Sequence, residues 1–303
     1  MEQPFFSILI PCYNAKKYLQ KALDSCKNQF FEDFEVILCD NHSKDGVQTL
    51  LSEFKMDNFK YFLGKHHINT IELRNFLIKQ ANGKYIIWLE PFDELLPGTL
   101  KILFDILLYQ HWDILEFTTL WKNNEQQLEA KIEQDNEYID DTCIDIYLNR
   151  NDMMQDNLWG KVFDTNLMKN SLPEPYDIYS AEEAFYSLSL YYNAKSFKIV
   201  KTIPLYCYNI EIDHFHGLSE FNFINIKKLC NIRNEQLKRN LKILKDNNLD
   251  TKDNKLACLD KLYLPNILND LINLENKEER IKAFDEFNKY FALQISSNLL
   301  NEG

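Results

Sequence analysis

The sequence has little glycine and proline, no basic excess and no apolar run long enough to cross a membrane. Only 7 glycines and 8 prolines occur in 303 residues, while 45% of the residues are hydrophobic, so we expect a sizeable folded core without long disordered segments. The formal net charge of −12 argues against a nucleic-acid partner, because the phosphate backbone would be repelled. No apolar stretch reaches the roughly 20 residues that a membrane-spanning helix needs.

The cysteine pattern and the first residues bear on the compartment. The seven cysteines contain no CxxC pair and no spacing typical of a metal site, and an odd number does not suit a disulfide framework. The chain begins MEQPFFSILIP, which lacks a basic segment and leads directly into an apolar run, so no export signal is predicted. We therefore expect reduced thiols and a cytoplasmic location, with peripheral contact at the inner membrane as an option.

Three short apolar runs each end in a cluster of polar residues. The runs and their clusters are Phe5–Ile10 with Pro11–Asn14, Glu35–Cys39 with Asp40–Asp45, and Tyr85–Leu89 with Glu90–Glu94. Stretches with helical periodicity lie between the runs, and strand–helix–strand order predicts parallel crossovers. Open parallel sheets bind ligands beyond the carboxyl ends of their strands, so we expect the first two polar clusters to face one crevice.

The order of elements predicts an α/β domain over residues 1–215 and a helical region over 216–303. Residues 1–120 alternate between strand and helix, including a strand Phe59–Leu63 and helices Thr70–Ala81 and Thr99–Tyr109. Residues 121–215 are less regular, and 122–141 is predicted to be a loop or short hairpin. From about residue 220 the pattern predicts three or four helices, which could pair two copies of the chain or touch a membrane, although they have no strongly basic face.

Four motifs in order resemble those of the inverting family-two glycosyltransferases. This chain reads SILIPCYN, EVILCDNHSKDG, LRNFL and WLEPFDELLPGTL where the family has approximately S-x-I-x-P-x-Y-N, V-D-D-G-S-x-D, A-R-N-x-G and D-x-D-D-x-x-x-P-x-x-L. The resemblance is close over the first 120 residues and looser to about residue 210. It implies a GT-A fold, a mostly parallel sheet flanked by helices. The implied activity moves a sugar from a nucleotide-diphosphate donor, most simply a UDP-sugar, to a saccharide or glycolipid acceptor in bacterial surface-glycan synthesis.

The resemblance places the nucleotide at the ends of the first two strands. Pro11, Tyr13 and Asn14 would surround the base, with the Tyr13 ring packed against it. Asp40 would accept a hydrogen bond from the base, because a carboxylate accepts but does not donate. The two residues after Asp40 differ from the family's Asp and Gly, which suggests a different loop or nucleotide. The alternative is that these residues only form turns at the strand ends.

Arg74 and two acids would complete the donor side. Arg74 aligns with the arginine of A-R-N and could hold phosphate oxygens bidentately; the alternative is a solvent-facing arginine. Glu90 and Asp93 stand in the family's acid motif, which implies a divalent metal, Mn²⁺ or Mg²⁺, and for Glu90 also contact with the nucleotide. Phe92 replaces one of the family's acids and cannot bind a metal, so a metal-independent site is the alternative. His216, in DHFHG, is a further candidate metal ligand unless it lies in a solvated loop.

The catalytic base and the acceptor site are assigned by the same resemblance. An inverting transfer needs a general base, and SAEEAFYSL resembles G-E-D-x-x-F, whose second acid is the usual base. That position is Glu183, and Glu182 is its neighbour; the alternative is a pair of solvated acids in the first turn of a helix. Trp159 and Lys161, in LWGKVF, resemble a W-x-K-x-[FY] strand beside the acceptor, although Trp159 would serve equally as a core aromatic.

Two other functions fit the sequence less well. A sugar nucleotidyltransferase would need a Gly-rich, basic segment after the first strand, and PCYNAKKYL contains no glycine. A catalytically silent binding or scaffold protein is favoured by Phe92 in the acid motif and by a glutamate at the base position. The sequence therefore predicts a glycosyltransferase whose nucleotide half follows the family more closely than its metal and base positions do.

Overall fold

The computed structural model describes residues 3–122, 127–130, 134–140, 142–149, 157–173 and 183–209, with short segments at 238, 240–249, 251, 253–254 and 281. The chain divides into two compact units, Met1–Asp177 with Ala181–His214, and Ile178–Ser180 with Phe215–Gly303. The elements below belong to the first unit. The predicted helical region 216–303 lies outside the described residues apart from the short segments, so its helix bundle and its proposed contacts stay predictions. Within the described part of the chain, no helix is long and apolar enough to cross a bilayer.

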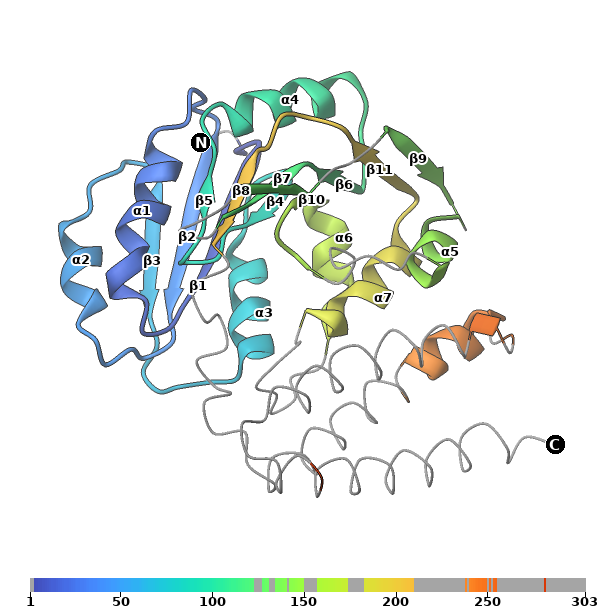
Figure 1. Ribbon diagram of the computed structural model, residues 1–303. Coiled ribbons are helices and arrows are strands. Elements are labelled where there is room, and N and C mark those ends of the chain that lie inside the picture. Colours follow the sequence, from blue (N-terminus) through green and yellow to red (C-terminus); the bar gives the residue numbers. More distant parts are fainter. Residues whose placement is uncertain are drawn as a thin grey trace. The chain divides into compact units, whose positions relative to one another are not determined.

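An eight-stranded mixed sheet forms the centre of the first unit, in the order β3-β2-β1-β4-β10-β6-β11-β9 (Figure 1). Its strands are β1 (Phe6–Cys12), β2 (Phe34–Asp40), β3 (Phe59–Leu63), β4 (Tyr85–Trp88), β6 (Ile114–Phe117), β9 (Asn136–Ile139), β10 (Lys161–Asp164) and β11 (Ser196–Val200). β10 and β9 run antiparallel to their neighbours, and the other strands are parallel to one another. The predicted α/β fold with a mostly parallel sheet is confirmed.

Helices cover both faces of the sheet, which is why its central strands are continuous apolar runs. α1 (Lys16–Lys27), α2 (Val47–Glu53) and α4 (Thr99–Tyr109) share one core cluster with the even-numbered residues of β1. Alternate residues of a strand point to opposite faces, and α3 (Thr70–Gln80) contacts β1 and β2 on the other face. α6 (Thr165–Asn170) contacts α3 and α7 (Ala184–Asn193), and α7 contacts α5 (Thr142–Asn149) (Figure 1).

A second sheet of four strands brings a late segment of the domain beside the residues that follow β4. Its order is β5 (Glu94–Leu95), β12 (Tyr206–Asn209), β7 (Thr119–Lys122) and β8 (Gln127–Ala130). β12 pairs antiparallel with β5 and parallel with β7. The sequence pattern does not predict β5 or β7, and segment 122–141 supplies β8 to this sheet and β9 to the main one. β12 is thereby held next to the acid motif.

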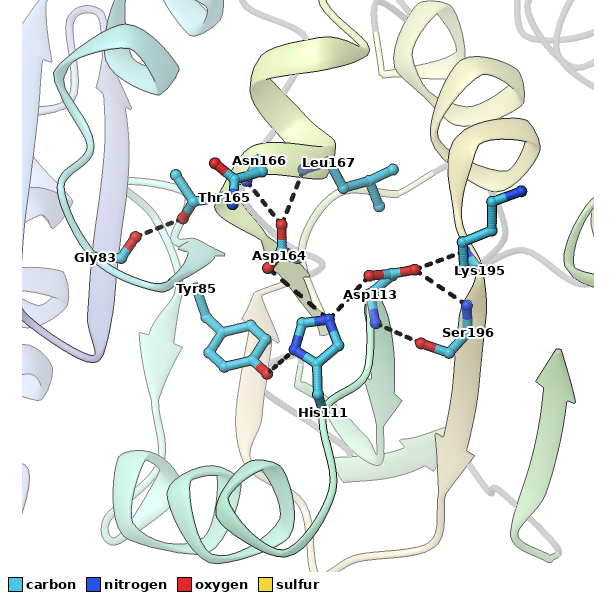
Figure 2. A network of polar contacts seen from close by, with 10 residues as sticks. All are labelled: Gly83, Tyr85, His111, Asp113, Asp164, Thr165, Asn166, Leu167, Lys195 and Ser196. Atoms are coloured by element: carbon cyan, nitrogen blue, oxygen red, sulfur yellow. Dashed lines mark hydrogen bonds and ion pairs between the residues drawn. The ribbon is translucent and has the colours of Figure 1, made fainter. Parts of the chain in front are cut away.

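A polar network around His111 fixes the edge of the main sheet at which β4 begins (Figure 2). His111 Nδ1 lies 2.8 Å from the Tyr85 hydroxyl, and Nε2 lies 3.0 Å from Asp113 Oδ1 and 4.0 Å from Asp164 Oδ2. Asp113 accepts hydrogen bonds from two backbone N–H groups at the start of β11, and Asp164 caps the first turn of α6. The network joins the starts of β4, β6 and β11 to the end of β10. Glu90 lies beyond the other end of β4.

Candidate active site

The polar residues that follow β1 and β2 lie against each other. β1 sits between β2 and β4, so the strand order reverses there, and open α/β sheets bind ligands at such points. The Asn14 N–H donates to Ser43 Oγ at 2.8 Å, and Asn14 Oδ1 accepts from the Lys44 N–H at 2.9 Å. Asn14 has a left-handed backbone with φ 47°, which asparagine adopts more readily than most residues. The two predicted polar clusters therefore meet at one edge of the sheet.

Asp40 ends β2 and is held by two residues of the loop and helix that follow. Its side chain is buried, and Oδ1 accepts hydrogen bonds from the hydroxyl and the N–H of Ser43. Oδ2 accepts from Gln48 Nε2 at 2.8 Å. Ser43 belongs to the family motif, whereas nothing in the sequence pattern singles out Gln48, the second residue of α2. The contact between Asp40 and a base stays a prediction.

Tyr13 and His67 place two rings beside this loop. Tyr13 is 37% exposed, and its ring centroid lies 4.5 Å from that of His67. His67 is positioned by Asn41, whose carbonyl oxygen lies 3.2 Å from His67 Nδ1 and whose side-chain amide bonds both backbone groups of Ile68. Asn41 stands where the family has an acid, and here it ties the segment before α3 to the end of β2. Pro11 is buried at the end of β1.

Arg74 joins two acids from distant parts of the chain. It lies on α3 with 3% of its surface exposed, so it is not the solvent-facing arginine of the alternative interpretation. Arg74 Nη2 lies 2.8 Å from Glu90 Oε1 and 3.4 Å from Glu183 Oε1, and both glutamate side chains are 16% exposed. The guanidinium carbon lies 4.8 Å from the centre of the Trp88 ring. One cation thus links Glu90, the second residue after β4, with Glu183, the residue before α7.

Residues Glu90–Asp93 form a tight turn that is closed by a hydrogen bond from the Asp93 N–H to the Glu90 carbonyl oxygen at 3.0 Å. The Asp93 side chain is buried, and its carboxylate accepts from the Tyr206 hydroxyl at 2.7 Å and from the Asn209 N–H at 2.9 Å. Burial raises the pKa of Asp93 well above its ordinary value, against these two hydrogen bonds, and the charges of Glu90 and Glu183 raise it further.

Glu183 lies at the start of α7, and its carbonyl oxygen accepts from the Tyr186 N–H at 2.9 Å. The Tyr186 hydroxyl donates to Asn75 Oδ1 at 2.7 Å, which ties α7 to the α3 residue next to Arg74. These bonds place the Glu183 side chain beside Arg74. Glu182 lies outside the described residues.

Trp159 and Lys161 have buried surroundings. The Trp159 ring stacks on Tyr208 at 4.5 Å and on Tyr206 at 5.6 Å, with interplanar angles of 10° and 18°. Lys161 is 1% exposed, and its Nζ lies 3.9 Å from a carboxylate oxygen of Glu116. This packing favours the core-aromatic alternative for Trp159, and contact of either residue with an acceptor stays a prediction.

Residues 7–171 match the family described as Glycosyl transferase family 2. The chain belongs to this family. The expected family and the GT-A fold are confirmed. The match runs from Ser7 in β1 past the end of α6 and includes Asp40, Arg74 and the turn Glu90–Asp93, which we call the acid turn.

Proteins similar to this chain occur in bacteria. The chain is 33% identical over 103 residues to the GalNAc(5)-diNAcBac-PP-undecaprenol beta-1,3-glucosyltransferase of Campylobacter jejuni, which covers 33% of each protein. It is 24% identical over 206 residues to the poly(ribitol-phosphate) beta-N-acetylglucosaminyltransferase TarS of Staphylococcus aureus, covering 66% of this chain and 35% of TarS. The crystal structure of TarS with UDP-GlcNAc has the same fold, with a TM-score of 0.72, 20% identity and coverage of 94% of this chain and 81% of that one. The chain spans about a third of the length of these two relatives.

Family-two glycosyltransferases commonly use a divalent metal. The acid motif of this chain offers fewer candidate metal ligands than the family pattern does. Both carboxylate oxygens of Asp93 accept hydrogen bonds, and Phe92 packs edge-on against Tyr18 at 5.5 Å. His216 lies outside the described residues, and across the described ones no group of three His, Cys, Asp or Glu side chains could hold a metal ion. Glu90 alone among the predicted ligands described here suits a metal, and Mg²⁺ accepts one carboxylate completed by substrate phosphates.

Proposed function

We propose that this glycosyltransferase moves a sugar from a UDP-sugar to a hydroxyl group of a saccharide or glycolipid, with inversion, in the synthesis of a bacterial surface glycan. The observation that carries the proposal is that Arg74 contacts both Glu90, at the donor side, and Glu183, the proposed base. TarS has been solved with UDP-GlcNAc, and the named relatives act on an undecaprenol-linked saccharide and on poly(ribitol-phosphate). These relatives support the donor class and the acceptor class.

The nucleotide would bind at the ends of β1 and β2. The exposed Tyr13 ring offers an apolar face to a base, next to Pro11 and Asn14. Asp40 would accept an N–H of the base, and Ser43 and Gln48 hold its carboxylate in place before the donor arrives. This preorganisation favours binding because fewer groups have to be ordered when the donor binds.

The reaction would be a direct displacement at the anomeric carbon. Glu183 accepts the proton of the acceptor hydroxyl while that oxygen forms the new glycosidic bond, and the bond between the anomeric carbon and the diphosphate oxygen breaks to release UDP. Glu182 is the alternative base. Arg74 supplies positive charge beside the donor side, and a metal ion held by Glu90, with His216 as a further candidate ligand, would neutralise the departing diphosphate. Trp159 and Lys161 are the proposed acceptor-side residues.

The test measures UDP release and sugar transfer by the full chain with a panel of UDP-sugars, with and without Mn²⁺. Glu183→Gln keeps the size and the hydrogen-bonding reach of the side chain but removes the base, so turnover should fall by about 10²–10⁴-fold with a donor KM close to that of the wild type. Glu53→Gln, an exposed acid at the end of α2, is the matched control and should retain turnover. Unchanged turnover in Glu183→Gln would reject this base assignment, and donor binding without any turnover by the wild type would favour a silent scaffold.

A further inference from the structure

We infer that Asp93 is a positioning residue, which acts through Tyr206 to fix the backbone of Glu90, and that it is not a metal ligand. The inference rests on the proposed function only where it concerns activity. Asp93 and Tyr206 are 113 positions apart, and both are buried. We call the two side chains, together with the backbone groups they bond, the acid-turn clamp.

The Tyr206 hydroxyl bridges both ends of the turn. It donates its proton to Asp93 Oδ2 at 2.7 Å and accepts a hydrogen bond from the Glu90 N–H at 3.2 Å. A hydroxyl group has one proton to donate and two lone pairs that accept, so these two bonds use it in complementary ways. The carboxylate of Asp93 determines the direction of the hydroxyl proton and leaves a lone pair directed at Glu90.

The other Asp93 oxygen anchors the far end of β12. Asp93 Oδ1 accepts from the Asn209 N–H at 2.9 Å, while Tyr206 and Cys207, at the start of β12, pair with Leu95 and Glu94 of β5. The Trp159 ring, stacked on Tyr206, limits sideways movement of the phenol. Asp93 thus holds β12 at both its ends against the segment that follows β4.

This clamp determines where the Glu90 carboxylate can lie. The Glu90 backbone is fixed by Tyr206 and by the turn hydrogen bond to Asp93, while its side chain pairs with Arg74. Charged groups at a reaction site contribute only when they are held within fractions of an ångström of their working positions. Both Asp93 oxygens bond groups that hold the backbone of this turn and of β12, which assigns the acid to positioning.

Hydrogen–deuterium exchange of the ligand-free full chain tests the clamp without reference to activity. Tyr206→Phe removes the acceptor of the Glu90 N–H, so exchange at that amide should accelerate at least tenfold, and Asp93→Asn should give a smaller acceleration. Tyr85→Phe is the matched control, because it also removes a hydrogen-bonded hydroxyl from a buried tyrosine, at the other end of β4 (Figure 2). The Glu90 amide should exchange in this control as in the wild type. An unchanged rate in Tyr206→Phe would overturn the inference.

Kinetics then separate positioning from metal binding. Tyr206→Phe and Asp93→Asn should each lower kcat/KM for the UDP-sugar about tenfold per folded molecule. The double variant should have a kcat/KM no lower than that of either single variant. The Mn²⁺ concentration for half-maximal activity should not change in any of the three. If Asp93→Asn raised that concentration while Tyr206→Phe did not, Asp93 would be a metal ligand. If the losses followed only the folded fraction, the clamp would be merely structural. A wild type without turnover would reject the proposed function, and the exchange result would still decide on the clamp.

Discussion

Replacing Arg74 with methionine should destabilise the protein strongly, because it leaves two partly buried carboxylates without their common cation. The guanidinium lies 2.8 Å from Glu90 and 3.4 Å from Glu183, with 3% of the arginine side chain exposed. Removing one partner of a buried ion pair costs about 3–5 kcal/mol, and the lost contact with the Trp88 ring adds about 1 kcal/mol. Together these costs give a loss of about 4–6 kcal/mol, which for a unit of this size lowers Tm by about 10–20 °C.

Urea unfolding of the full chain, followed by tryptophan fluorescence, measures this loss. The triple variant Arg74→Met, Glu90→Gln, Glu183→Gln carries no unpaired charge at these positions and should recover most of the stability, since the cost comes from uncompensated carboxylates. Lys101→Met is the matched control: it breaks an exposed ion pair with Asp105 on α4 and should cost under about 1 kcal/mol. An Arg74→Met variant within about 1 kcal/mol of the wild type, or a triple variant no more stable than Arg74→Met, would refute the reasoning.

Two further predictions concern the packing of β1 against its neighbours. Burial alone would raise the pKa of Glu35, but hydrogen bonds from Ser7, the Asn82 N–H and Lys60 hold this pKa below its ordinary value. The stability that the Glu35 carboxylate contributes is therefore present at neutral pH and is lost as the pH falls through the lowered pKa. Glu35→Gln should therefore cost about 1–3 kcal/mol at neutral pH and flatten the acid side of a plot of unfolding free energy against pH; an unchanged acid side would contradict this. A Cβ on Gly83 would lie 2.5 Å from the Ser7 backbone nitrogen, so Gly83→Ala should lower the free energy of unfolding in urea by about 3 kcal/mol. A variant as stable as the wild type would contradict this prediction.

The strands that lead to the candidate site could be predicted because each is a short apolar run followed directly by polar residues. The observed bounds of β3 and α4 are the predicted ones, and β1 and β2 differ from prediction by one or two residues at their ends. β5 and β7 could not be predicted in this way. β5 has two residues, too few to show a period, and its pairing with β12 depends on a segment more than a hundred residues later.

Side-chain roles were harder to predict than the strands, because the decisive contacts are long-range. Arg74 and Glu183 are 109 positions apart, and no local pattern reports that they meet. Asp93 has the residue type and the position of a metal ligand in the family pattern. Its hydrogen bond to Tyr206 depends on the pairing of β12 with β5, which no local sequence pattern predicts. Trp159 illustrates the same limit, since the sequence is identical whether the ring stacks on a sugar or on Tyr208.

The acid turn and Arg74 together give a physical reason for a phenylalanine where the family has an acid. Glu90 and Glu183 already share one guanidinium, and their charges act with burial to raise the pKa of Asp93. A further carboxylate in the turn would add negative charge beside these acids, close to where a negatively charged diphosphate is proposed to bind. Phe92 instead packs against the apolar core cluster. The departure from the family pattern therefore lowers the negative charge that the site has to balance before it can bind a nucleotide sugar.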